Sequence, residues 1–159
     1  MKGIFITFEG IDGCGKSTQC ELLKDYLKDN NKDFIFVREP GGTVIGERIR
    51  EILLDKKNTQ MNSRTELLLF EAARAQITEE VIKPALDEGK IVLCDRFFDS
   101  SSAYQGMARN MGMDFVAGLN MAATGGLKPD VTFFFDITVE QDEAKNLIRF
   151  LKERLYWDK

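Results

Sequence analysis

Histidine is absent from the 159-residue sequence. Its absence excludes serine–histidine triads, histidine general bases and metal sites built on imidazole. Cysteine is scarce: Cys14, Cys20 and Cys94 are odd in number and lack a metal-type spacing, so we interpret them as free thiols of a reducing cytoplasm. Any chemistry must therefore use carboxylates, cations, backbone amides or a metal ion.

Long apolar runs and an excess of positive charge are also lacking. No run approaches the roughly 18 residues that a membrane span needs, and the N-terminal segment resembles a strand rather than a signal peptide. The net charge is −4, from 22 basic and 26 acidic residues. This balance argues against broad nucleic-acid binding but allows a positive pocket for a small anionic ligand. We therefore expect neither a membrane nor a nucleic acid as a partner.

Short apolar runs alternate with amphipathic segments along the chain, without a repeat or a linker. The patterns predict strands over 3–8, 34–37, 91–94 and 131–137, and helices over 16–28, 46–54, 102–111 and 114–123. A longer helix should begin at a capping box, Ser63 to Glu66, and end by Gly89, with Pro84 ending or kinking it earlier. Residues 140–159 form one further amphipathic segment. This alternation predicts an α/β fold in three layers, with a parallel sheet flanked by helices on both faces.

A phosphate-binding loop follows the first predicted strand. Residues 10–17, Gly-Ile-Asp-Gly-Cys-Gly-Lys-Ser, match the P-loop pattern in full, and a helix follows them. The glycines let backbone amides turn toward phosphates, and the helix N-terminus favours the anion. Lys16 supplies a positive charge to the β- and γ-phosphates, and the Ser17 hydroxyl can coordinate Mg²⁺. The alternative is a glycine-rich turn without a ligand.

Asp95 ends the apolar run of the third predicted strand. Ligands of parallel sheets bind beyond the carboxyl ends of the strands. A carboxylate at this position, beside a P-loop, is placed to hold Mg²⁺. The alternative is a polar residue that caps the turn after the strand.

Four arginines, Arg38, Arg50, Arg74 and Arg96, lie at or near element ends rather than in a charge run. The planar guanidinium suits a second phosphorylated ligand because it can bind phosphate through two hydrogen bonds. Each alone could equally be a solvated surface residue. Phe70 lies one helical turn before Arg74, which suits a nucleobase pocket, but periodicity alone favours Phe70 as a core residue.

Four blocks of the sequence together resemble the bacterial thymidylate kinase family. They are residues 8–18, 38–43 (Arg-Glu-Pro-Gly-Gly-Thr), 95–106 (Asp-Arg-Phe-Phe-Asp-Ser-Ser-Ser-Ala-Tyr-Gln-Gly) and 126–132 (Gly-Leu-Lys-Pro-Asp-Val-Thr). They occur in the family's order and spacing and cover about residues 3–140. The first block is shared with other P-loop kinases, whereas the second and third are highly specific. The resemblance implies ATP-dependent phosphorylation of thymidine monophosphate in a single P-loop kinase domain, residues 1–159, that works as a cytoplasmic homodimer.

The resemblance also implies a role for each candidate residue. The donor ATP would be bound by Gly10, Ile11, Asp12, Gly13, Cys14, Gly15, Lys16, Ser17 and Thr18, with Mg²⁺ held through Ser17 and Asp95. Lys16, Arg96 and Asp12 would be the catalytic residues, with Asp12 near the acceptor's sugar and phosphate. Arg38 and Arg96 would bind the acceptor phosphate, and Arg50 would line the pocket wall. Phe70 would stack on thymine, Arg74, Ser101 and Gln105 would contact the base edge, and Tyr104 would pack under the deoxyribose.

The sequence departs from the family after residue 140, where members carry a basic lid followed by a strand and a helix. Residues 141–159 show no recognisable lid, and neither Arg149 nor Arg154 has a lid-like context. Family members without a P-loop arginine generally use a lid arginine instead. The sequence is therefore either a truncated or internally deleted product or part of a longer protein, and only a chain that is truly this short should bind nucleotide and transfer weakly. Two alternative functions therefore stand beside the main one: another P-loop nucleoside or nucleotide kinase, and a catalytically impaired nucleotide-binding domain.

Overall fold

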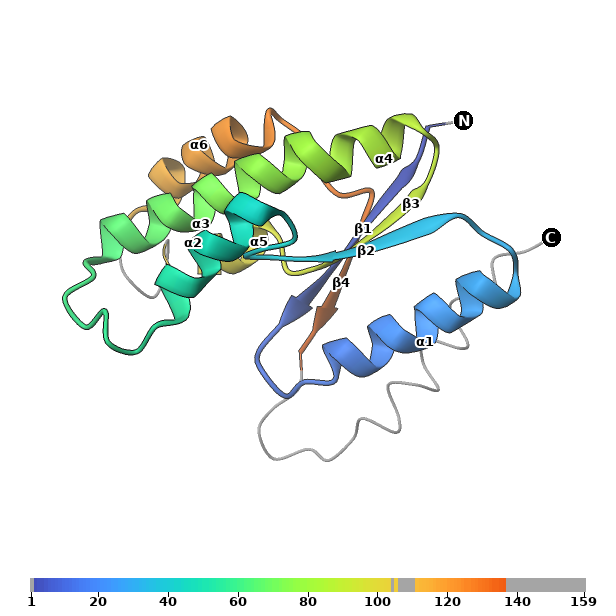
Figure 1. The fold of residues 1–159 in the computed structure, drawn as a ribbon, viewed down its shortest axis with the longest axis horizontal. Coiled ribbons are helices and arrows are strands. Elements are labelled where there is room, and N and C mark those ends of the chain that lie inside the picture. Colours follow the sequence, from blue (N-terminus) through green and yellow to red (C-terminus); the bar gives the residue numbers. More distant parts are fainter. Residues whose placement is uncertain (1, 104, 106–110, 137–159) are drawn as a thin grey trace.

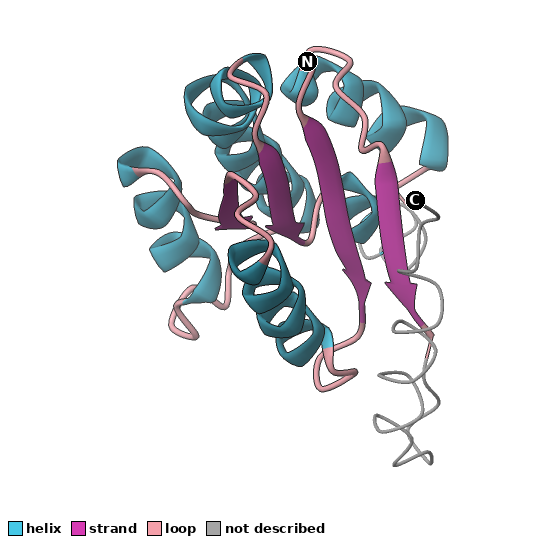
Figure 2. Cartoon of the chain, turned by 90° about the vertical axis from the view of Figure 1, so that its right-hand side faces the viewer, coloured by secondary structure: helices cyan, strands magenta, loops and turns pink. Residues whose placement is uncertain are grey.

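Four parallel strands form one sheet in the computed structural model, which describes residues 2–103, 105 and 111–136. The strands are β1 (Ile4–Gly10), β2 (Phe34–Arg38), β3 (Ile91–Asp95) and β4 (Val131–Phe135), in the spatial order β2-β3-β1-β4. Figure 2 shows them side by side with their arrowheads pointing the same way. In register, Phe8 of β1 lies beside Asp95 of β3, and Arg38 of β2 lies on the other side of Asp95. The carboxyl ends of β1, β2 and β3 therefore lie next to one another at the same end of the sheet.

The helices connect these strands as crossovers. They are α1 (Lys16–Asp29), α2 (Val44–Leu54), α3 (Ser63–Ile77), the π-helical turn η1 (Thr78–Ile82), α4 (Lys83–Asp87), α5 (Phe98–Ser101) and α6 (Met113–Thr124). Figure 1 shows α1 on one side of the sheet and α3, α4 and α6 on the other. The predicted three-layer α/β architecture with a parallel sheet is thus confirmed.

Each face of the sheet has its own apolar core. On the α3–α4 side, Phe5 of β1 packs with buried residues of β3 and of the helices, including Ile77, Ile82 and Val92. On the α1 side, Phe8 packs with Leu23 and Leu27 of α1 and with Phe135 of β4. The alternation of Phe5 and Phe8 to opposite faces follows from the two-residue period of a strand. The two cores fix β1 from both sides, and β1 leads directly into the P-loop.

Several predicted boundaries require correction. The N-cap of α3 is Asn62, whose side chain accepts a hydrogen bond from Thr65 N, so the capping box predicted at Ser63 is wrong by one residue. Pro84 does not end the long helix, because it lies in the first turn of α4, where its missing N–H is tolerated. Of the helix predicted over 102–111, residues 104 and 106–110 lie outside the described residues, as does the whole segment 137–159. Within the part of the chain that the structure describes, no helix combines the length and apolarity needed to cross a bilayer.

Candidate nucleotide-binding site

The strand order creates a crevice between the carboxyl ends of β1 and β3. From β1 the chain crosses toward β2 at one edge of the sheet, and from β3 it crosses toward β4 at the other edge. Connections that leave two neighbouring strands in opposite directions open a crevice in which α/β proteins bind ligands. Residues 10–17 follow β1 and residues 95–101 follow β3, so both predicted motifs reach this crevice.

The P-loop occupies the β1–α1 connection, as predicted. Gly10, Gly13 and Gly15 have φ values of 145°, 80° and 91°, a region in which a side chain is strained. Lys16 is buried, and its Nζ donates to the carbonyl oxygens of Gly10 and Ile11, each at 2.7 Å. The ammonium group is thus held over the loop by the loop's own backbone, ready to exchange those carbonyls for an anionic oxygen.

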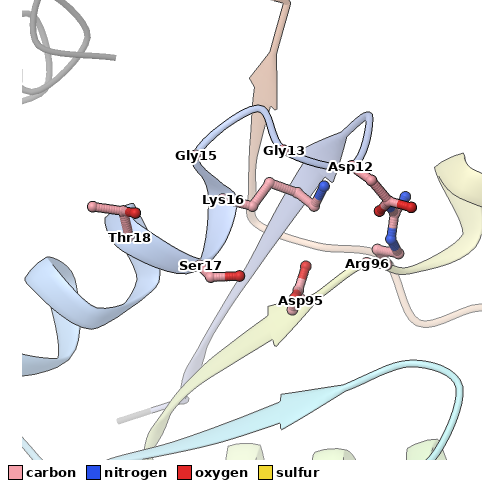
Figure 3. Close-up of a pocket in the computed structure, with 8 residues that line it drawn as sticks. All are labelled: Asp12, Gly13, Gly15, Lys16, Ser17, Thr18, Asp95 and Arg96. Atoms are coloured by element: carbon pink, nitrogen blue, oxygen red, sulfur yellow. The ribbon is translucent and has the colours of Figure 1, made fainter.

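An open pocket of about 290 Å³ lies beside the loop. Figure 3 shows the residues that line it, all of them predicted from the sequence: Asp12, Gly13, Gly15, Lys16, Ser17, Thr18, Asp95 and Arg96. Two further loop residues differ in their placement. The Ile11 side chain is exposed, whereas Cys14 is buried and packs into the core on the α1 side. From this buried position, Cys14 Sγ accepts a hydrogen bond from Lys16 Nζ at 3.7 Å.

Asp95 and Ser17 point toward one another across the pocket, whereas Thr18 projects away from them (Figure 3). Asp95 Oδ1 is buried and has no hydrogen-bond partner among the described residues. A buried carboxylate oxygen without a partner is costly, and a hard cation such as Mg²⁺ would satisfy it. No group of three or more His, Cys, Asp or Glu side chains suited to a metal occurs in the described ranges. The donor set therefore fits an ion that is bound by one carboxylate, one hydroxyl and ligand phosphates.

Arg96 reaches from the end of β3 to the P-loop. Its backbone has φ 70°, the left-handed region, which directs the side chain away from the strand axis. Arg96 Nη2 donates to Asp12 Oδ1 at 2.6 Å, and Nη1 donates to Ser100 Oγ at 3.2 Å. The Asp12 side chain is 99% exposed, so its carboxylate adds little stability through this ion pair. The contact does bring two of the three predicted catalytic side chains, Arg96 and Asp12, together in one place (Figure 3).

Arg38 and Arg50 form a second cationic cluster, at the end of β2. Both guanidiniums donate to the carbonyl oxygen of Pro40, at 3.4 and 2.8 Å. Arg38 Nη2 also donates to both carboxylate oxygens of Glu47, and this Glu47 carboxylate has a lowered pKa because it accepts from Gly42 N and faces Arg38. Burial and the charge of Arg38 lower the pKa of Arg50. Two guanidiniums held this close favour an anion between them.

Arg74 is 2% exposed and lies at the centre of a buried polar network. Its Nε donates to Glu39 Oε2 at 2.8 Å, and its Nη2 donates to the Phe97 carbonyl oxygen at 3.1 Å. Its Nη1 donates to acceptors on three elements, namely Glu71, Ser101 and Asn120. These contacts leave one of the five guanidinium hydrogens, on Nη2, without a partner among the described residues. Ser101 is thus brought against Arg74, as the predicted base-edge pair requires.

The other predicted pocket residues are placed less completely. Phe70 is half-buried and belongs to neither buried core cluster, so the core interpretation that periodicity favours is not supported. Gln105 is buried and donates to Glu66 Oε1 at 2.9 Å, which attaches it to α3. Tyr104 lies outside the described residues.

Sequence reasoning missed several carboxylates around the site. Glu9 is buried at the end of β1 and accepts from Phe97 N and Ser100 Oγ, each at 2.6 Å. Burial raises the pKa of Glu9, although both hydrogen bonds oppose the shift. A single carboxylate within an apolar strand, next to the glycine loop, was a signal that could have identified Glu9. The carboxylates of Glu39 and Glu71 gave no comparable signal, because their shared partner Arg74 is distant from Glu39 in sequence.

Comparison with known proteins points to one family over most of the chain. The thymidylate kinase family model matches residues 8–154. A thymidylate kinase of Thermosipho africanus is 56% identical across 94% of this chain and 76% of its own length. One from Thermoanaerobacter sp. is 55% identical across 89% of this chain and 69% of its own length. The crystal structure of thymidylate kinase from Ehrlichia chaffeensis, 37% identical, covers 98% of this chain and 90% of its own, with a TM-score of 0.80.

Proposed function

The chain belongs to the thymidylate kinase family, and from that premise we propose that its pocket moves the γ-phosphoryl group of ATP onto thymidine monophosphate. It is a nucleoside monophosphate kinase, and ATP is its phosphoryl donor. The family match over residues 8–154 is the observation that carries this function, because a P-loop alone leaves the acceptor open. The matched relatives are thymidylate kinases, which favours thymidine monophosphate over the other acceptors considered from the sequence.

On the donor side, we assign the triphosphate to the pocket beside the P-loop. Asp12, Gly13 and Gly15 of the loop line this pocket together with the first residues of α1, and a helix N-terminus favours an anion. Lys16 Nζ would leave the carbonyls of Gly10 and Ile11 for the β- and γ-phosphate oxygens. The exchange costs little, because one set of oxygen acceptors replaces another.

Ser17 and Asp95 would hold Mg²⁺, as the unpartnered Oδ1 of Asp95 supports. When bound, the ion neutralises charge on the phosphate oxygens. Asp95 is the last residue of β3 and lines the pocket beside the loop, so its carboxylate already lies on the side of the bound donor.

On the acceptor side, Arg38 and Arg96 would bind the monophosphate, with Arg96 between donor and acceptor, and Arg50 would line the pocket wall beside Arg38. The acceptor phosphate needs no strong general base, because its second pKa is about 6. Transfer then depends on aligning the two phosphates and on cancelling charge as the bond breaks. Arg96, directly after β3, and Lys16, at the start of α1, supply that positive charge, which agrees with a chain that contains no histidine.

The base would lie between Phe70 and the Arg74 network. Half-buried Phe70 offers a ring face, and the remaining Nη2 hydrogen of Arg74 can donate to a base carbonyl. Ser101 and Gln105 are held near the same side of α3 by Arg74 and Glu66. We keep Tyr104 as the residue under the deoxyribose.

A coupled assay of ADP release tests the function. Thymidine, thymidine monophosphate and uridine monophosphate are each offered with ATP and Mg²⁺. We expect the highest kcat/KM with thymidine monophosphate. Faster turnover of thymidine would reassign the chain to the nucleoside kinases, and tight ATP binding without any product would support the non-catalytic alternative.

We also propose that two copies pair through the helices of one side. Exposed apolar side chains gather on α2, α3 and α6, which pack against one another: Val44, Ile45, Ile52, Leu54, Leu68, Met113, Phe115 and Met121. An exposed apolar surface of this kind favours association. Light scattering during size-exclusion chromatography should give twice the monomer mass; a monomer mass at micromolar concentration would refute the pairing.

A cytoplasmic location is proposed from the three free thiols.

A further inference from the structure

The turn that follows β3 carries Arg96 in a strained conformation. Arg96 has φ 70°, and a non-glycine residue in the left-handed region persists only where its surroundings hold it. Strained residues of this kind cluster at ligand sites, where neighbouring residues hold them in place.

All four backbone polar groups of residues 96 and 97 are engaged. Arg96 N donates to Phe8 O, and the Arg96 carbonyl accepts from Cys94 Sγ, each at 3.0 Å. The Phe97 carbonyl accepts from Arg74, and Phe97 N donates to Glu9 Oε1. Two of these bonds are charge-assisted and therefore of the stronger kind, the one from Arg74 and the one to the Glu9 carboxylate.

The second oxygen of Glu9 acts on the Arg96 side chain. Ser100 Oγ donates to Glu9 Oε2 at 2.6 Å, and Arg96 Nη1 donates to the same Ser100 Oγ at 3.2 Å. A carboxylate can only accept, so the Ser100 hydrogen must point at Glu9. A lone pair of Ser100 is thereby left facing the guanidinium.

We propose that Glu9 is a positioning residue for Arg96: one carboxylate oxygen fixes the backbone turn and the other orients Ser100 to hold the guanidinium at the phosphate site. The proposal rests on the proposed function for the identity of the ligand. Glu9 touches neither substrate nor cofactor in this account. It acts through Arg96, so removing it should lower kcat only while Arg96 is present.

Glu9→Gln is the informative variant. Glutamine keeps the shape of the side chain but offers one acceptor oxygen where the site uses two. If that oxygen stays with Phe97 N, the amide NH₂ faces Ser100 and reverses the bond. Thr7→Val is the matched control, because Thr7 lies two residues earlier on the same face of β1 and is fully buried. Its hydroxyl shares a hydrogen bond with Thr132 Oγ1 at 2.9 Å.

The test is a cycle with Arg96→Ala, read as kcat at saturating ATP and thymidine monophosphate. We expect Glu9→Gln to lower kcat about tenfold or more, since small misplacements at a reacting centre have effects of this size. In the Arg96→Ala background it should change kcat less than twofold. Thr7→Val should leave kcat within twofold of the unaltered chain's value, even if it lowers the melting temperature. Equal factors in both backgrounds, or a folded Glu9→Gln chain with unchanged kcat, would overturn the proposal.

Two further measurements cover the remaining cases. Should Glu9→Gln fail to fold, Ser100→Ala replaces it in the same cycle, with the same expected dependence on Arg96. Should the unaltered chain bind ATP yet produce no ADP with thymidine monophosphate, the proposed function fails. The role of Glu9 is then decided by ligand-free crystal structures: in Glu9→Gln the Arg96 guanidinium should leave Ser100, and an unchanged contact would refute the role.

Discussion

Asp95 ends β3 with one buried carboxylate oxygen, Oδ1, that has no partner among the described residues. Leaving a buried polar group unpaired costs about 1–3 kcal/mol, and more when the group is charged. Asp95→Asn replaces the charge with a neutral amide, which costs less to leave unpaired. We therefore expect Asp95→Asn to stabilise the metal-free protein by about 1 kcal/mol, or about 2–4 °C for a domain of this size.

The same substitution should impair the reaction. An amide is a much poorer ligand for Mg²⁺ than a carboxylate, and removal of one electrostatic group at a reacting centre typically costs about a hundredfold in rate. Melting temperature in EDTA and ADP release across a Mg²⁺ titration measure the two effects separately. Stability and activity should move in opposite directions.

Asp130 provides the control for this prediction. Its Oδ2 accepts from Phe5 N at 2.8 Å, at the far end of β1 from the pocket. Asp130→Ala should lower stability by about 1 kcal/mol through loss of that acceptor and leave kcat unchanged. An Asp95→Asn chain that melts earlier in EDTA and keeps its rate at every Mg²⁺ concentration would refute the assignment of Asp95 to the ion.

Three other predictions concern the loop and the buried network. Lys16→Met should lower single-turnover transfer by about a hundredfold or more, because it removes a charge that no other described residue supplies at Gly10 and Ile11; a loss below fivefold would count against Lys16 as the phosphate cation. Gly10→Ala should fail to fold stably, since its Cβ would lie 2.8 Å from Phe135 O at φ 145°. The Cβ of Gly13→Ala meets no atom within 4 Å, so this variant should lose about 1 kcal/mol of stability through backbone strain alone. Thermal melts compare the two variants, and equal losses of melting temperature would contradict this reasoning. Burial, which outweighs the opposing Arg74 charge, raises the pKa of Glu39 from 4.5 to about 7, so the folded state keeps the proton longer and loses stability as pH rises between those values. Glu39→Gln should flatten that decline in urea unfolding between pH 5 and pH 8, and an unchanged slope would refute the shift.

The P-loop and the strand ends were predictable because their signals are local. The glycine spacing of residues 10–17 specifies a backbone that only glycine adopts easily, and the structure shows positive φ values at Gly10, Gly13 and Gly15. Asp95 was predicted for a similar reason, since an apolar run followed by a carboxylate marks a strand end in a parallel sheet. All eight residues that line the pocket beside the loop came from such local patterns and from the family resemblance.

Long-range contacts were not predictable in the same way. Arg74 binds partners from the loop after β2 and from α3, α5 and α6, and no spacing in the sequence relates Glu39 or Asn120 to it. Glu9 was visible as a charge in an apolar strand, yet its role depends on the left-handed turn at Arg96, which sequence patterns do not indicate. The observed N-cap of α3, Asn62, lies one residue before the predicted one, because Asn62 and Ser63 are both good N-cap types and the sequence pattern alone does not choose between them.

The central claim is that the γ-phosphoryl group of ATP passes directly to thymidine monophosphate. Phosphorus-31 NMR of the chain with ATP, Mg²⁺ and thymidine monophosphate follows every phosphorus atom at once. We predict resonances of ADP and of thymidine diphosphate that grow at equal rates. Growth of inorganic phosphate in place of thymidine diphosphate, or no loss of ATP at all, would contradict the claim.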